Sequence, residues 1–113
     1  MAGLTTHVLD LAGGKPAAGV AVRLLGKTAD AVTQLGAFVT DADGRARLAA
    51  APEVGGYRLE FDIGAYFRAS GASSAEPGFL ETVVIDFTLT DPAMHHHVPL
   101  LVSPFGYSTY RGS

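Results

Sequence analysis

Cysteine is absent from the 113-residue sequence, and this absence narrows the chemistry that the chain can carry out. Without thiols there is no disulfide framework, no thiolate nucleophile and no zinc site built on cysteine. No unbroken apolar run reaches the ~18 residues that a membrane-spanning helix requires. The first ten residues, MAGLTTHVLD, lack the basic segment and apolar core of a signal peptide. We therefore expect a cytoplasmic protein with no membrane partner.

Charged side chains are also scarce. They make up 17% of the chain, compared with about 25% in an average soluble domain, whereas apolar residues make up 48%. This combination suggests that other subunits cover part of the surface. The formal net charge of -3 argues against a nucleic acid partner, because a phosphate backbone is bound by a basic face.

Common catalytic motifs are missing as well. The sequence contains no Gly-x-Ser-x-Gly nucleophile elbow, no phosphate-binding loop and no paired carboxylate motif. The segment DADG at 41–44 has the composition of a calcium loop but lacks the later glutamate of such a loop. We therefore interpret it as a β-turn.

Apolar residues alternate with polar ones along several stretches, which is typical of half-buried strands. The clearest apolar sets are Val20, Val22 and Leu24; Tyr57, Leu59 and Phe61; and Val83, Ile85, Phe87 and Leu89. Turn-forming segments divide the chain at 13–19, 41–44, 51–56, 70–78 and 91–92. This spacing predicts one all-β sandwich domain, residues 1–113, with seven to eight strands.

One short helix is expected at residues 63–70. Asp62 precedes it as a candidate N-cap, and Gly71 follows it as a stop signal. The Gly- and Ser-rich segment after the helix, at 70–78, is expected to form a flexible loop and is a candidate cover for a site.

Three of the four histidines are consecutive, at 95–97. In an extended strand neighbouring side chains point to opposite faces, so His95 and His97 share one face and His96 takes the other. His96 is in step with the apolar residues that follow, which predicts that it faces the core. His97 is in step with Leu101 and should point outward, onto a face that we expect a partner subunit to cover.

These residue types leave several interpretations open when they are taken one at a time. His7, His95 and His97 could hold a metal, but zinc needs three or four ligands and no carboxylate or thiol lies close in sequence to complete the set. A lone histidine in a strand, such as His7, is more often structural. Arg45 follows a turn, where an arginine is usually solvated, and Arg47 has the same strand parity and could replace it.

Five segments together resemble the transthyretin-like family of 5-hydroxyisourate hydrolases. The most specific is the C-terminal block, because its final YRGS is similar to the hydrolase signature that hormone-carrying transthyretins lack. The segments are LTTHVLD at 4–10, GKPAAGV at 14–20, TDADGR at 40–45, YRLEFDIGAYF at 57–67 and HHHVPLLVSPFGYSTYRGS at 95–113.

The resemblance implies a transthyretin-like β-sandwich, a homotetramer with sites where two dimers meet, and neither a cofactor nor a metal. The positions that match the family's active site are His7, Arg45, His97, Tyr110, Arg111, Gly112 and Ser113. The expected catalytic groups are His7, Arg45, His97 and Ser113, and the expected substrate-binding groups are His7, Arg45, Tyr110 and Arg111. His96 stands where the family usually has tyrosine.

The implied reaction opens the six-membered ring of 5-hydroxyisourate to 2-oxo-4-hydroxy-4-carboxy-5-ureidoimidazoline during urate breakdown. We expect His7 and His97 to hold and deprotonate the attacking water, with a slight preference for His7 as the base. Arg45 would offset the developing negative charge. The Ser113 carboxylate would orient a histidine or pair with an arginine.

Three other hypotheses compete with this one. A transthyretin-like carrier would bind a small ligand without catalysis, a sandwich accessory module would belong to a larger protein, and a metallohydrolase would lose activity to a chelator. The carrier is the strongest alternative, but it would need an apolar binding channel, whereas the expected site contains histidine and arginine. The chain shows no linker at either end, which disfavours the accessory module.

Overall fold

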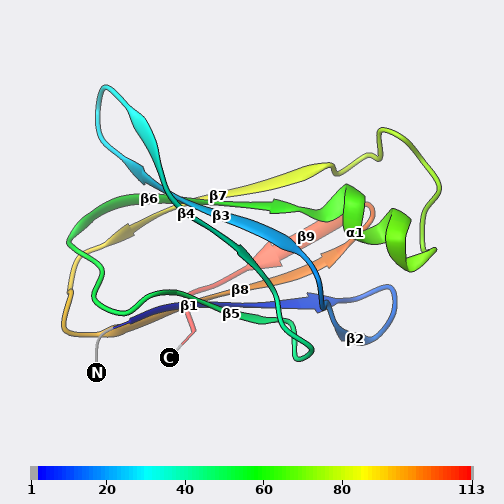
Figure 1. The fold of residues 1–113 in the computed structure, drawn as a ribbon, viewed down its shortest axis with the longest axis horizontal. Coiled ribbons are helices and arrows are strands. Elements are labelled where there is room, and N and C mark those ends of the chain that lie inside the picture. Colours follow the sequence, from blue (N-terminus) through cyan, green and yellow to red (C-terminus); the bar gives the residue numbers. More distant parts are fainter. Residues whose placement is uncertain (1–2, 113) are drawn as a thin grey trace.

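The computed structural model describes residues 3–112, which form two layers of β-sheet with one helix at one end (Figure 1). The predicted all-β sandwich with a single short helix is therefore confirmed. In chain order the elements are β1 (Gly3–Asp10), β2 (Lys15–Pro16), β3 (Ala21–Lys27), β4 (Val32–Val39), β5 (Arg45–Ala49), β6 (Gly55–Asp62), α1 (Ile63–Ser70), β7 (Thr82–Leu89), β8 (His95–Ser103) and β9 (Gly106–Thr109).

The first sheet is built around β1. One edge of β1 pairs in parallel with β8, which in turn pairs with β9, and the other edge pairs with β5 and then with β2. Because β1 and β8 run in the same direction, the start of β1 lies beside the histidine triplet that opens β8. Gly112, the last described residue, also pairs with His97 at this end of the first sheet.

The second sheet has the order β4-β3-β6-β7 and is antiparallel throughout. Its alternating apolar sets face the first sheet: Val22, Leu59 and Phe61 are fully buried. His96 is also turned into the interior, where Nδ1 donates a hydrogen bond to the Met94 carbonyl oxygen at 2.9 Å. The strand parity predicted for His96 is thus confirmed.

Residues 3–112 form nine strands, one more than the predicted upper number. The two-residue strand β2 lies inside a segment that the sequence marks as a turn, where Lys15 and Pro16 pair with the end of β1. A tight turn at Pro104 and Phe105 also divides the C-terminal run into β8 and β9. Short pairings of this kind carry almost no periodic signal.

The helix α1 has its predicted bounds, and Gly71 closes it in the left-handed conformation, with φ of 81°. The prediction that Asp62 caps its N-terminus is wrong, because the Asp62 side chain makes no cap hydrogen bond. Its carboxylate instead accepts two hydrogen bonds from Arg23, both 2.8 Å. The carbonyl oxygen of Glu81 accepts the first free amide hydrogens of the helix, from Ile63 and Gly64.

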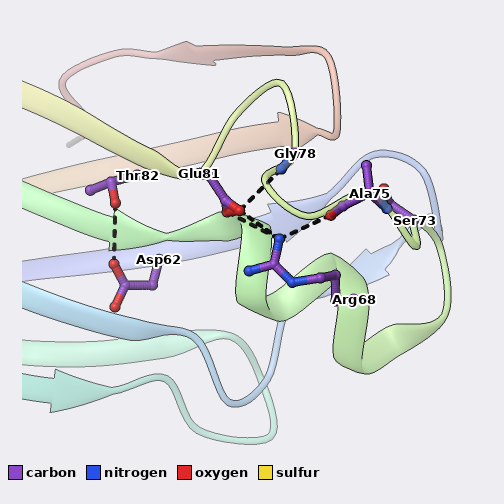
Figure 2. A network of polar contacts seen from close by, with 7 residues as sticks. All are labelled: Asp62, Arg68, Ser73, Ala75, Gly78, Glu81 and Thr82. Atoms are coloured by element: carbon purple, nitrogen blue, oxygen red, sulfur yellow. Dashed lines mark hydrogen bonds and ion pairs between the residues drawn. The ribbon is translucent and has the colours of Figure 1, made fainter.

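The segment between α1 and β7 is held by its own polar network (Figure 2). The Glu81 carboxylate accepts hydrogen bonds from Arg68 and from the backbone of Gly78. This segment packs toward Pro104 and Phe105 at the end of β8 that is remote from the histidines. It is therefore no cover for the histidine site. None of the described residues forms a helix of the length and apolarity that crossing a bilayer requires.

Candidate active site

The outer face of the first sheet collects the polar residues that the sequence analysis identified. Strand register places Thr5 between His97 of β8 and Arg47 of β5, and two residues further along it places His7 beside Arg45. Directly opposed side chains on one face of a sheet lie within contact distance. Three strands that are distant in sequence therefore bring two imidazoles and two guanidinium groups together.

His7 and His97 are neighbours across the β1–β8 pair. Their ring centroids are 6.4 Å apart and the rings are tilted by 37°. Both side chains are half-buried, so each ring keeps an edge open to a small molecule. His7 and His97 therefore lie on one face of the first sheet, on adjacent strands.

The turn before β5 fixes the proton of His7. Its Nε2 lies 2.9 Å from the Asp43 carbonyl oxygen. A carbonyl oxygen only accepts, so this nitrogen must carry a hydrogen, and neutral His7 has its lone pair on Nδ1. Gly44 makes the turn feasible, because at its φ of 75° a Cβ would lie 2.5 Å from the Val8 carbonyl oxygen.

The electrostatic environment of His97 favours its neutral form. Burial lowers the pKa of His97 below its ordinary value, and electrostatic interaction with His7 and Arg45 lowers it further. The imidazole nitrogen Nδ1 contacts the Thr5 hydroxyl oxygen at 2.8 Å. Neutral histidine with one nitrogen held by a hydrogen bond has the properties of a general base.

A cavity of about 410 Å³ opens over this face. Such a volume is within the range of small-molecule sites. A larger hollow of about 770 Å³ lies beside α1 and β2, but its lining includes no histidine, and Lys15 and Asp62 are its charged residues. The chemistry therefore points to the smaller cavity, which is lined by Thr5, Thr6, Asp41, Arg45, Ala46, Arg47, His95 and His97.

The C-terminal tail returns to His97. Gly112 donates a backbone hydrogen bond to the His97 carbonyl oxygen at 2.7 Å. A Cβ at Gly112 would lie 2.8 Å from Cδ2 of the His97 ring, so the close approach depends on glycine. Tyr110 is 59% exposed and Arg111 is exposed, and neither lines the cavity of this chain. The expected catalytic group Ser113 lies outside the described residues.

Two participants were not among the expected site residues. Thr5 and His95 form a hydrogen bond at 3.0 Å, with the Thr5 hydroxyl lying between His95 and His97. The sequence signal that could have identified Thr5 and His95 is their strand parity, which places them on the same face as His7 and His97. Within residues 3–112, no three histidine or acidic side chains are grouped closely enough to hold a metal ion.

Comparison with known proteins agrees with this fold. The family model described as "HIUase/Transthyretin family" matches residues 4–112. A 5-hydroxyisourate hydrolase of Caulobacter vibrioides is 59% identical over 115 residues, which cover 100% of both chains. A 5-hydroxyisourate hydrolase of Mesorhizobium japonicum is 52% identical, covering 97% of this chain and 91% of its own.

Solved structures show the same similarity. The Klebsiella pneumoniae 5-hydroxyisourate hydrolase superposes with a TM-score of 0.81 at 39% identity, covering 98% of this chain and 99% of its own. Sea bream transthyretin in complex with thyroxine has a TM-score of 0.85 at 34% identity, covering 96% and 93%. The sandwich is thus transthyretin-like, and the chain belongs to the HIUase/transthyretin family.

Proposed function

We propose that this chain is a 5-hydroxyisourate hydrolase that opens the six-membered ring of its substrate to 2-oxo-4-hydroxy-4-carboxy-5-ureidoimidazoline in urate degradation. The observation that carries the proposal is the meeting of His7, Arg45 and His97 on one sheet face in a chain 59% identical to a hydrolase of that name. The reaction is the hydrolysis of a cyclic amide without a metal. The whole chain acts as one domain in this proposal.

His97 is the general base. Its lowered pKa keeps it neutral near pH 7, and the hydrogen bond at Nδ1 leaves Nε2 free to accept a proton. As a water oxygen bonds to the ring carbonyl carbon, one water proton passes to Nε2. The ring C–N bond then breaks, the nitrogen takes that proton back from His97, and the carbon becomes a carboxyl group.

His7 orients the attacking water in this mechanism rather than deprotonating it. Its Nε2–H is committed to the Asp43 carbonyl oxygen, which leaves Nδ1 to accept a hydrogen bond. This reverses the slight preference for His7 that the sequence alone suggests. A histidine that only orients the water should be less costly to replace than the base.

Arg45 stabilises the negative charge that forms on the carbonyl oxygen. It lines the cavity and is the register partner of His7. A guanidinium offers several fixed donors, and preorganised donors of this kind contribute a large share of many rate enhancements. Arg47, two residues further along β5, lines the same cavity and can contact the substrate from the other side.

The remaining groups act in an assembled homotetramer in the cytoplasm. Tyr110 and Arg111 are exposed in this chain and contact substrate where dimers meet, and the Ser113 carboxylate orients a histidine or pairs with an arginine. The low content of charged residues and the half-exposed Tyr107 and Tyr110 support burial of this region between subunits. A thyroxine-type carrier is not favoured, because the cavity is lined by arginine and histidine.

The test is the ultraviolet decay of freshly generated 5-hydroxyisourate. Wild-type protein should accelerate this decay, and His97→Asn should lower kcat by ~10²–10⁴-fold, the usual contribution of one general base. Arg58→Gln is the matched control for Arg45→Gln, because Arg58 pairs with Asp86 on the other sheet. Spontaneous decay unchanged by wild-type protein would refute the proposed function.

A further inference from the structure

The Thr5 hydroxyl lies between two imidazoles. Its Oγ1 is 2.8 Å from Nδ1 of His97 and 3.0 Å from Nε2 of His95. Parallel register places Thr5 directly opposite His97, and His95 stands one strand repeat earlier on the same face. The three side chains therefore form one continuous chain of hydrogen bonds along the floor of the cavity.

The chain of hydrogen bonds has a direction. Among residues 3–112 the two imidazoles are the hydrogen-bond partners of Thr5 Oγ1. A hydroxyl has one hydrogen and two acceptor lone pairs, so it can donate to only one imidazole, and the other imidazole must then donate to it. When Nε2 of His95 carries no hydrogen, it can only accept, so Thr5 donates to His95 and His97 Nδ1–H donates to Thr5. When Nε2 of His95 carries a hydrogen, Thr5 accepts it, and the Thr5 hydrogen is free to point to Nδ1 of His97.

The direction decides whether His97 can act. In the first arrangement Nδ1 of His97 carries the proton and Nε2 has the free lone pair. In the reversed arrangement Nδ1 accepts from Thr5, so neutral His97 carries its proton on Nε2 and cannot take one there. The reversed arrangement requires a hydrogen on Nε2 of His95, which is always present when His95 is protonated.

The surroundings hold both rings in place. A Cβ at Gly3 would lie 3.0 Å from Nδ1 of His95, and a Cβ at Gly112 would lie 2.8 Å from Cδ2 of His97. The charged and titratable groups that share the cavity are Asp41, Arg45 and Arg47, and His7 flanks His97.

We propose that Thr5 and His95 are positioning residues that keep the proton of neutral His97 on Nδ1 and leave Nε2 free as the base. This inference rests on the proposed function for its kinetic consequence but not for its structural one. A hydrogen on Nε2 of His95 removes this constraint, because Thr5 is then free to donate to Nδ1 of His97 and the reversed arrangement becomes possible.

The first test compares Thr5→Val with Thr5→Ser. Valine keeps the shape and strand preference but removes the hydroxyl, whereas serine keeps it. Thr5→Val should lower kcat by at least ~10-fold with KM close to wild type, because the base loses its preferred tautomer. Thr5→Ser should recover most of that loss. A wild-type kcat in Thr5→Val would overturn the proposal.

A second pair of variants tests His95. His95→Gln keeps an oxygen that can accept from Thr5, and His95→Leu does not. His95→Gln should retain more activity than His95→Leu. Equal activities in the two variants would overturn the role of His95, and circular dichroism checks that each variant is folded.

The decisive measurement needs no substrate. In ¹⁵N-labelled wild-type protein, the imidazole resonances of neutral His97 should show the hydrogen on Nδ1, and in Thr5→Val they should shift toward the Nε2–H form. A wild-type spectrum with the hydrogen on Nε2 would overturn the proposal. Because this readout does not depend on turnover, it separates failure of the positioning role from failure of the proposed hydrolase activity.

Discussion

His7 Nε2 donates a hydrogen bond to the backbone carbonyl oxygen of Asp43 at 2.9 Å, across 36 residues of sequence. The contact ties β1 to the turn that precedes β5. The same turn places Arg45, whose backbone N–H is held at 3.0 Å by the Asp41 carboxylate. One turn thus sets the tautomer of a histidine and the position of an arginine on the same face.

Asp41→Ala should lower hydrolysis more than its exposed position suggests. The Asp41 carboxylate accepts hydrogen bonds from the backbone of Asp43 and Arg45, and both would be lost. We expect kcat/KM to fall by roughly 10-fold, since small displacements of aligned groups are costly. Asp41→Asn keeps an acceptor oxygen and should be less affected. Equal losses in Asp41→Ala and in Asp30→Ala, a change in another exposed turn, would contradict this assignment.

The pH dependence of hydrolysis should follow the lowered pKa of His97. A base acts only when it is unprotonated, so a pKa below the ordinary ~6.5 of histidine places the acid limb of kcat/KM below that pH. Because the unfolded chain binds the proton more readily than the native state, stability also declines as the pH falls below ~6.5. A pH–rate profile measures the pKa of the catalytic base, and an NMR titration measures the pKa of His97. The two values should agree.

Arg45→Gln should shift the acid limb of the pH–rate profile. The Arg45 charge is one of the causes that lower the pKa of His97, so its removal should raise that pKa and move the acid limb to higher pH. Arg58→Gln removes an equal charge from the other sheet and should leave the limb in place. A limb that shifts equally in both variants would mean that Arg45 does not act on His97.

The sequence predicts which way the three consecutive histidines face, but it does not predict the hydrogen bonds that hold the site. Strand parity alone places His96 in the core and His95 and His97 outside, because a two-residue period leaves no other choice in a strand. The hydrogen bonds of Thr5 depend on the parallel register of β1 with β8, some 90 residues later, and a local pattern carries no information about that register. The Asp43 carbonyl has no side-chain signal at all.

The N-terminus of α1 is a second feature that a local sequence pattern does not predict. Asp62 stands at the correct position for a cap, yet its carboxylate is bound by Arg23 from a neighbouring strand. The paired guanidinium holds the pKa of Asp62 below its usual range. A two-contact bond between oppositely charged groups is stronger than a cap bond from the carboxylate to an uncharged backbone N–H, so tertiary structure overrides the local preference.

Gly112→Ala should weaken catalysis without weakening the fold. Its Cβ would lie 2.8 Å from Cδ2 of His97, so either the tail or the ring must move. We expect kcat to fall while Tm stays near wild type, because the tail contributes little to the core. Gly106→Ala is the control, since a Cβ there meets nothing within 4 Å. Full activity in Gly112→Ala would show that the tail can leave His97 without consequence.

Gly64→Ala should destabilise the opposite end of the sandwich and leave the histidine site unaffected. A Cβ at Gly64 would overlap the Glu81 carboxylate, which accepts hydrogen bonds from Arg68 and Gly78 (Figure 2). Because a glutamate side chain is flexible, it should swing away and give up those contacts. Gly64→Ala should therefore lower Tm by about as much as Glu81→Ala does, with kcat unchanged.

The double variant tests whether Gly64→Ala lowers Tm by displacing the Glu81 side chain. If the alanine acts by displacing Glu81, the double variant Gly64→Ala, Glu81→Ala should be no less stable than Glu81→Ala alone, since the same contacts cannot be lost twice. Thermal unfolding of the four proteins measures this coupling. Losses that add would locate the damage in the helix backbone, because Gly64 is buried at the first turn of α1 and donates to the Glu81 carbonyl oxygen independently of that carboxylate.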